Sequence, residues 1–200
     1  MAGATSALDR IRAERVVAVL RRVEDVDAVV DDLLGGGIRI VEVTLDSHDA
    51  LATIERLRGT SALTVLAGTV RTPQEAAAAA SAGAEACVAP ALNPAMVERC
   101  HELGLPAIPG ALTPSELEAA RALGAELIKL FPASLGGPGY VRDVLAPLRD
   151  VELIVTGGID SSNAGDFLAA GAVAVGVGSA LTGAGDVEGA ARRVVAAVSP

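Results

Sequence analysis

The stretch GIRIVEVTL, residues 37–45, contains the structural unit that decides the predicted fold. Glycine often follows the last turn of a helix, and Gly37 stands directly before an apolar run rich in Ile and Val. In an extended strand every second side chain lies on the same face, which places Glu42 on one face and Val41 and Val43 on the other. The stretch therefore predicts the end of a helix followed by a buried strand that carries one acidic side chain.

The same junction between helix and strand recurs along the chain. Gly83, Gly124 and Gly171 occupy places equivalent to Gly37, at successive intervals of 46, 41 and 47 residues. Two β–α units occupy about this length, so the spacing indicates a series of parallel units rather than a solenoid. Eight apolar runs are typical of buried strands, namely residues 16–20, 38–45, 63–67, 86–90, 106–109, 127–131, 153–155 and 173–177.

Eight strands alternating with helices in 200 residues favour an α/β fold of the (β/α)8, or TIM-barrel, class. We expect a single domain over residues 1–200, with residues 1–15 as a short N-terminal helical extension. The loops should be short, because such barrels usually have about 250 residues. An open, doubly wound sheet is the alternative, since periodicity alone does not show that a sheet closes.

Helix starts are marked as clearly as helix ends. Thr72-Pro-Gln-Glu75 and Thr113-Pro-Ser-Glu116 are both capping boxes with proline at the first helical position. Asn93-Pro94 starts a third helix in a similar way. These signals predict helices between the strands.

Composition limits the class of protein. Hydrophobic residues make up 51% of the chain and aromatic residues only 2%, so we expect a core of Ala, Val, Leu and Ile. The formal net charge of -9 argues against nucleic acid or an anionic membrane surface as a partner. The sequence contains neither an apolar run of about 18 residues nor a signal-peptide core in residues 1–15, which predicts a cytoplasmic protein.

Metal chemistry is not expected. Cys87 and Cys100 share no metal-ligand spacing with His48 or His101, and they lie in apolar or helical patterns typical of buried thiols.

Lys129 is the single lysine among sixteen Lys and Arg residues, and it lies in the apolar run LIKLF. A desolvated amine can lose its proton and attack a carbonyl group, whereas a guanidinium stays charged. Strand alternation places Lys129 on the face of Leu127 and Phe131, which should point into the barrel. A structural lysine that reaches solvent or pairs with a carboxylate is the alternative.

Glu42 is a second charged residue on an inward face, in the second predicted strand. The second and sixth strands lie opposite each other in an eight-stranded barrel, so Glu42 and Lys129 should converge across a pocket. A covalent amine facing a proton-transfer group fits acid/base chemistry at a carbonyl substrate. A purely structural ion pair is a serious alternative.

Further candidates follow the predicted strands, at the end of the barrel where chemistry collects. Arg21 follows the first strand and Thr69 the third, and both could hold a carboxylate, although solvated loop residues would look the same. Glycine-rich turns follow the seventh and eighth strands. Because their backbone N–H groups can approach an anion, these turns predict a phosphate site, formed by Gly157, Gly158, Gly178 and Ser179.

With these residues the chain resembles the 2-keto-3-deoxy-6-phosphogluconate (KDPG) aldolase family, which also includes 4-hydroxy-2-oxoglutarate (KHG) aldolases and phosphogalactonate relatives. The resemblance rests on VVAVLR, GGIRIVEVTL, AGTV, PAIPGALTPSEL, IKLFPA, VTGGI and GVGSAL, from about Val16 to Leu181. It implies a (β/α)8 fold, a homotrimer, and cleavage of a 2-keto-3-deoxy sugar acid to pyruvate and an aldehyde without a cofactor.

The resemblance also implies roles for individual residues. Lys129 matches the Schiff-base lysine of the family, and Glu42 matches its general acid/base glutamate. The residues expected to bind substrate are Arg21 and Thr69 at the pyruvate portion, Gly157, Gly158, Gly178 and Ser179 at the phosphate, and Phe131.

One position departs from the family pattern. Many members have arginine directly after EVTL, where it binds the substrate carboxylate, but this chain has Asp46. Either Asp46 turns away while Arg21 and Thr69 bind the carboxylate, or the substrate differs.

The sequence therefore predicts a class I, Schiff-base aldolase that cleaves KDPG to pyruvate and glyceraldehyde 3-phosphate. The phosphogalactonate epimer and 4-hydroxy-2-oxoglutarate are alternative substrates. A phosphosugar isomerase or epimerase with Glu42 as its base, and a catalytically silent barrel, are alternatives from other classes.

Overall fold

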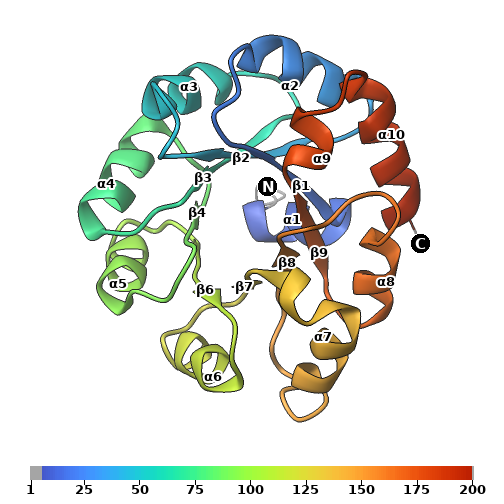
Figure 1. Cartoon of the computed structure of the whole chain (residues 1–200). Coiled ribbons are helices and arrows are strands. Elements are labelled where there is room, and N and C mark those ends of the chain that lie inside the picture. Colours follow the sequence, from blue (N-terminus) through green and yellow to red (C-terminus); the bar gives the residue numbers. More distant parts are fainter. Residues whose placement is uncertain (1–5, 200) are drawn as a thin grey trace, which may run out of the picture.

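The structure, a computed structural model, describes residues 6–199. Within them a parallel sheet curls into a barrel, and helices form a ring outside it (Figure 1). The strands are β1 (Val16–Leu20), β2 (Ile40–Thr44), β3 (Thr64–Gly68), β4 (Cys87–Val88), β5 (Ala107–Ile108), β6 (Gly110–Ala111), β7 (Ile128–Leu130), β8 (Leu153–Thr156) and β9 (Ala174–Val177). The helices are α1 (Ala7–Glu14), α2 (Val26–Gly35), α3 (Ala50–Leu57), α4 (Pro73–Ala82), α5 (Pro94–Glu102), α6 (Pro114–Ala122), the 3-10 helix η1 (Ala133–Leu135), α7 (Gly137–Leu145), α8 (Ala164–Ala169), α9 (Ser179–Thr182) and α10 (Val187–Val198).

The order of the strands argues against the open, doubly wound alternative. The order is β5-β4-β3-β2-β1-β9-β8-β7-β6, and every pair of neighbours is parallel. Strands that pair in the sheet also follow each other in the sequence, except for β1 and β9, the first and last strands of the chain, which pair with each other. A doubly wound sheet instead reverses its order at a switch point and carries helices on both faces.

The prediction of eight strands is wrong by one, because a second short strand, β6, follows β5 after Pro109 and lies outside the expected fifth strand, residues 106–109. Proline has no backbone N–H and cannot donate to a ladder. Before Pro109, the Ile108 carbonyl accepts from the Ala89 N–H at 3.0 Å; at Pro109, the carbonyl accepts from the Lys129 N–H at 2.9 Å. One short segment thus bonds to β4 on one side and to β7 on the other, which brings the two edges of the sheet together.

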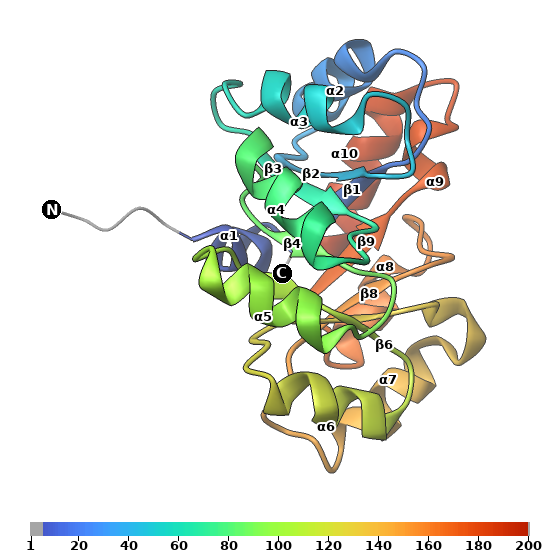
Figure 2. The same cartoon turned by 90° about the vertical axis from the view of Figure 1, so that its left-hand side faces the viewer.

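The strands have an apolar layer on each face. Leu127 belongs to the cluster inside the barrel, whereas Ile128 and Leu130 belong to the layer between sheet and helices, as the alternation predicts. Leu8 and Ile11 of α1 complete the inner cluster, and burial of such side chains stabilises the fold by roughly 1.5–3 kcal/mol each. Figures 1 and 2 show that α1 and α9 lie at opposite ends of the barrel. Helix α1 therefore plugs one end, and the other is left for a site.

The predicted helix signals are confirmed. Thr72 and Thr113 form capping boxes with Glu75 and Glu116, and the Asn93 side chain caps α5. The predicted helix-ending glycines all have left-handed backbones, with φ of 94° at Gly37, 92° at Gly83, 83° at Gly124 and 113° at Gly171. None of the helices within residues 6–199 is both long and apolar enough to cross a bilayer.

Candidate active site

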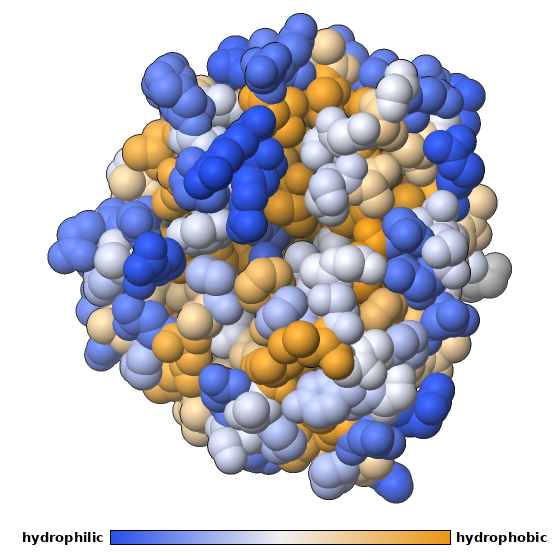
Figure 3. Space-filling model, viewed as in Figure 1, coloured by the Kyte–Doolittle hydropathy of each residue, from blue (hydrophilic) through white to orange (hydrophobic). Residues whose placement is uncertain are grey.

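A pocket of about 310 Å³ lies at the end of the barrel opposite α1. Segments far apart in the sequence line it, because the C-terminal ends of parallel strands meet there. Eight of the nine predicted site residues contribute to its wall: Arg21, Thr69, Lys129, Phe131, Gly157, Gly158, Gly178 and Ser179. Figure 3 shows this face of the molecule, with strongly hydrophilic side chains near α3 and β2 and an apolar patch between β7 and α7.

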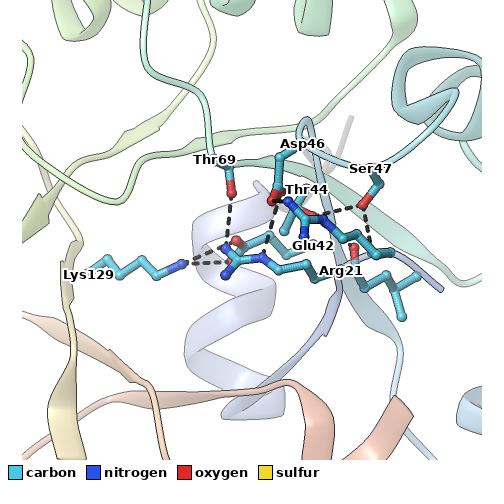
Figure 4. A network of polar contacts seen from close by, with 9 residues as sticks. Arg21, Glu42, Thr44, Asp46, Ser47, Thr69 and Lys129 are labelled. Carbon is cyan, nitrogen blue, oxygen red and sulfur yellow. Dashed lines mark hydrogen bonds and ion pairs between the residues drawn. The ribbon is translucent and has the colours of Figure 1, made fainter. Parts of the chain in front are cut away.

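Glu42, the ninth predicted residue, meets Lys129 inside the barrel (Figure 4). The Lys129 Nζ atom on β7 lies 3.2 Å from Oε1 and 3.4 Å from Oε2 of Glu42 on β2. Lys129 is 4% exposed and Glu42 is 1% exposed. The prediction that both side chains point inward and converge is therefore confirmed. The amine also lies 5.6 Å from the centre of the Phe131 ring, within the range of a cation–π contact.

Arg21 and Thr69 meet at the mouth of the pocket. The Arg21 Nη2 donates to Thr69 Oγ1 at 3.3 Å, so the two predicted carboxylate ligands lie side by side. Thr69 has a φ of 59°, in the left-handed region that residues other than glycine rarely adopt. Backbone strain of this kind gathers at functional sites, where surrounding contacts hold it.

Asp46, the position that departs from the family pattern, does not line the pocket. Its Oδ1 atom lies 3.7 Å from Arg21 Nε, and its Oδ2 atom lies 3.4 Å from Arg22 Nη2. Of the two alternatives that the sequence left open, this is the geometry of a turned-away Asp46.

The predicted phosphate loops line the same pocket. Gly157 and Gly158 follow β8 with φ of 106° and 73°, a conformation in which a larger residue would be strained. The Asn163 side chain donates to the Gly158 carbonyl at 2.9 Å. The Ser162 hydroxyl and N–H both donate to Asp160, which holds the pKa of this carboxyl below its ordinary value. The loop is therefore fixed before any ligand arrives.

Comparison with known proteins gives the family. Residues 8–197 match the family described as KDPG and KHG aldolase. The chain belongs to this family.

Individual relatives agree with that assignment. The chain is 39% identical to the 2-dehydro-3-deoxy-phosphogluconate aldolase of Treponema pallidum, covering 82% of this chain and 78% of the relative. It is 34% identical to the probable 2-dehydro-3-deoxy-6-phosphogalactonate aldolase of Rhizobium meliloti, covering 91% and 90%. The KDPG aldolase of Legionella pneumophila, with pyruvate captured as a covalent carbinolamine intermediate, matches with a TM-score of 0.82 at 27% identity and 94% coverage of both chains.

Thr156 is a pocket residue that the sequence did not single out. It ends β8, lines the pocket, and its Oγ1 atom is buried without a hydrogen-bond partner among residues 6–199. A buried hydroxyl that lacks a partner costs free energy, so a polar group of a ligand is its natural partner. Its position at the C-terminal end of an apolar strand is the signal that could have identified it.

Two glycines make room for the polar side chains inside this barrel. A Cβ atom on Gly68 would lie 2.3 Å from Glu42 Oε1, and a Cβ atom on Gly176 would lie 2.4 Å from Thr156 Oγ1. Both distances are far below van der Waals contact, so a side chain at either glycine would displace its neighbour. Neither glycine was singled out in the sequence for this role.

Within residues 6–199, no group of three or more His, Cys, Asp or Glu side chains could hold a metal ion.

Proposed function

We propose that the protein is a class I aldolase that cleaves KDPG to pyruvate and glyceraldehyde 3-phosphate through a Schiff base on Lys129. The observation that carries this proposal is the sole lysine of the chain, buried at a pocket with Nζ 3.2 Å from a buried carboxylate. The carbinolamine intermediate named for the Legionella pneumophila relative is the covalent chemistry expected of such a lysine.

The chemistry begins when Lys129 passes a proton to Glu42 and, as the neutral amine, attacks the C2 ketone to form a carbinolamine. Glu42 returns this proton to the carbinolamine hydroxyl, which leaves as water, and the protonated imine that results accepts the electron pair of the C3–C4 bond as that bond breaks. Glu42 takes the proton of the C4 hydroxyl, and the aldehyde leaves. Glu42 then gives this proton to C3 of the enamine, and water releases pyruvate and the amine from the protonated imine. Glu42 is placed for proton transfer because it already contacts the lysine that holds the substrate.

The rest of the pocket would hold the two ends of the substrate. Arg21 and Thr69 would bind the carboxylate of the keto acid, with Phe131 packed beside the pyruvate portion. Gly157, Gly158, Gly178 and Ser179 would bind the phosphate from the other side. Two anchors would orient the reacting carbon over Lys129.

A second substrate is favoured by two observations. Asp46 replaces the arginine that many family members carry after EVTL, and the Rhizobium meliloti relative is named for the phosphogalactonate. The phosphogalactonate epimer is therefore the second candidate, and 4-hydroxy-2-oxoglutarate the third.

We further propose a cytoplasmic homotrimer, for which the resemblance to the family is the support. Light scattering should give a mass about three times the 19.9 kDa of one chain. A monomer mass would rule the trimer out.

Borohydride trapping tests the proposed chemistry. Reduction in the presence of pyruvate should add one reduced pyruvyl group to Lys129, located by mass spectrometry of peptides. Lys129→Arg keeps a positive charge but should neither be labelled nor turn over KDPG, since a guanidinium is a poor nucleophile. Retained activity without any adduct would instead favour the isomerase or epimerase alternative, in which Lys129 acts only through its charge.

A further inference from the structure

The turn that carries Asp46 is fastened to the end of β1 by a chain of hydrogen bonds (Figure 4). The Arg22 N–H donates to the Ser47 hydroxyl at 2.9 Å, and the Ser47 and Thr44 hydroxyls lie 3.0 Å apart. The Thr44 hydroxyl donates in turn to the Leu20 carbonyl at 3.3 Å. These hydrogen bonds from the Ser47 and Thr44 hydroxyls therefore fix the position of Asp46 relative to the two arginines after β1.

The Asp46 carboxylate contacts both of these adjacent arginines, one with each oxygen. Its Oδ2 atom contacts Arg22, whose side chain is 74% exposed and does not line the pocket. Its Oδ1 atom contacts Arg21, which does line the pocket. The Arg21 guanidinium is thus held from two sides, at Nε by Asp46 and at Nη2 by the Thr69 hydroxyl.

We propose that Asp46 is a positioning residue, which holds Arg21 in the orientation that binds the carboxylate of the keto acid. This inference rests on the proposed function. A free arginine side chain loses rotamer entropy when substrate binding fixes it, and an anion already held at Nε removes part of that loss before substrate arrives. Asp46 does not line the pocket and lies farther from a bound substrate than from Arg21, so repulsion between Asp46 and the substrate is the smaller effect.

Positioning of Arg21 and repulsion of the substrate predict opposite changes in KM when the Asp46 carboxylate is removed. If Asp46 positions Arg21, Asp46→Ala should raise KM for the keto acid about 10-fold and change kcat by less than about threefold, because the carboxylate is bound alike in ground and transition states. If Asp46 only repelled the substrate, the same variant would lower KM.

A double-mutant cycle makes the test specific to Arg21. Arg21→Ala should raise KM at least as much as Asp46→Ala, and Asp46→Ala should add less than about twofold in the Arg21→Ala background. The matched control is Asp27→Ala, which removes the same charge from α2, where Asp27 pairs with Arg56 at 3.1 Å. It should leave KM within about twofold of wild type, since it has no contact with Arg21.

Each remaining outcome decides the matter. A lowered KM, an equal effect of Asp46→Ala with and without Arg21, or a raised KM in Asp27→Ala overturns the inference. Should Asp46→Ala lose its fold by circular dichroism, Asp46→Asn keeps the shape and must still raise KM. If borohydride traps pyruvate on wild type but the effects of Asp46→Ala and Arg21→Ala on KM are additive, only the role of Asp46 is overturned. If borohydride traps no pyruvate on wild type, the proposed function is overturned, and this inference with it.

Discussion

At the scale of single residues, Lys129 and Glu42 depend on each other because both are buried almost completely. Two charges taken out of water lose hydration, and their mutual attraction offsets this loss only while both are present. The same contact that keeps the pair stable also places a carboxylate beside the reactive amine. One ion pair can therefore serve the fold and the chemistry, and a substitution must separate the two roles.

Glu42→Gln tests the chemical role, because the amide keeps the shape of the side chain and an oxygen that can accept a hydrogen bond from Lys129 but cannot take up a proton. We expect a folded protein whose kcat with KDPG is lower by roughly 10²- to 10⁴-fold, the usual range for a positioned acid/base group. The matched control is Glu85→Gln, which removes a carboxylate that pairs with Arg10 outside the pocket and should leave kcat unchanged. An unfolded Glu42→Gln would support the structural ion pair, and a fully active one would exclude the proposed role.

Gly68 provides a test of how closely Glu42 must be placed. In Gly68→Ala the new methyl group would lie 2.3 Å from Glu42 Oε1, so the carboxylate must move. A displacement of about 1 Å can cost up to roughly 10²-fold in rate, and we expect kcat to fall by about 10- to 10²-fold. Gly59→Ala is the control, because nothing lies within 4 Å of its added methyl group. Equal activity of the two variants would show that Glu42 tolerates displacement.

At the scale of elements, the helices begin at local signals that do not depend on the barrel. The Thr113 hydroxyl accepts the Glu116 N–H, and the Glu116 carboxylate accepts the N–H groups of Leu112 and Thr113. Thr113→Ala should lower the free energy of unfolding by about 1 kcal/mol, measured by urea denaturation. Thr113→Ser keeps the hydroxyl and should stay close to wild type. No loss in Thr113→Ala would mean that packing alone holds the start of α6.

The same capping box should give a pH dependence with a defined sign. The N–H groups of Leu112 and Thr113 hold the pKa of Glu116 below its ordinary value of 4.5. A carboxyl whose pKa is lowered by folding stabilises the fold above its unfolded pKa, and this stabilisation is lost as the pH falls through the folded pKa. The free energy of unfolding of wild type should therefore exceed that of Glu116→Gln by its largest amount at pH 7, and the difference should shrink below about pH 4.5.

At the scale of the whole molecule, the barrel places two anchors and one lysine in the wall of a single pocket. The chain carries a net charge of -9, so an anionic substrate must be bound by local groups and not by the overall field. Arg21 extends from the end of β1, whereas the glycine loops follow β8 and β9. The pairing of β1 with β9, the first and last strands of the chain, brings these segments to one pocket.

This arrangement predicts a preference for phosphorylated substrates. We expect kcat/KM for KDPG to exceed that for the unphosphorylated acid by at least about 10²-fold, a difference of roughly 2.7 kcal/mol, because binding at a remote phosphate orients the reacting carbon. The phosphogalactonate and 4-hydroxy-2-oxoglutarate complete the set of substrates to be measured. Ser179→Asp should depress only the phosphorylated substrates, while Ser81→Asp, on the exposed side of α4, should depress none. Equal rates for both acids would exclude the phosphate site and favour the hydroxy-oxoglutarate reaction.

The sequence alone determined the features that arise from local chemistry. Strand alternation assigned the inward faces of Glu42 and Lys129, because side chains alternate with a period of two in any strand. The capping boxes and the left-handed glycines fixed where helices begin and end, because these interactions join residues only a few positions apart. The family motifs indicated the chemistry as well, because they contain the lysine and the glutamate expected to react.

Only the tertiary structure decided what depends on contacts between distant segments. It ended the expected fifth strand before Pro109 and added β6 after it, since the carbonyl groups of Ile108 and Pro109 bond to different neighbours. It placed Asp46 between Arg21 and Arg22, and it left the Thr156 hydroxyl buried in the pocket wall. Whether a polar residue finds a partner depends on which strands the closed sheet brings beside it. That pairing is set by the barrel as a whole, so no local pattern in the sequence records it.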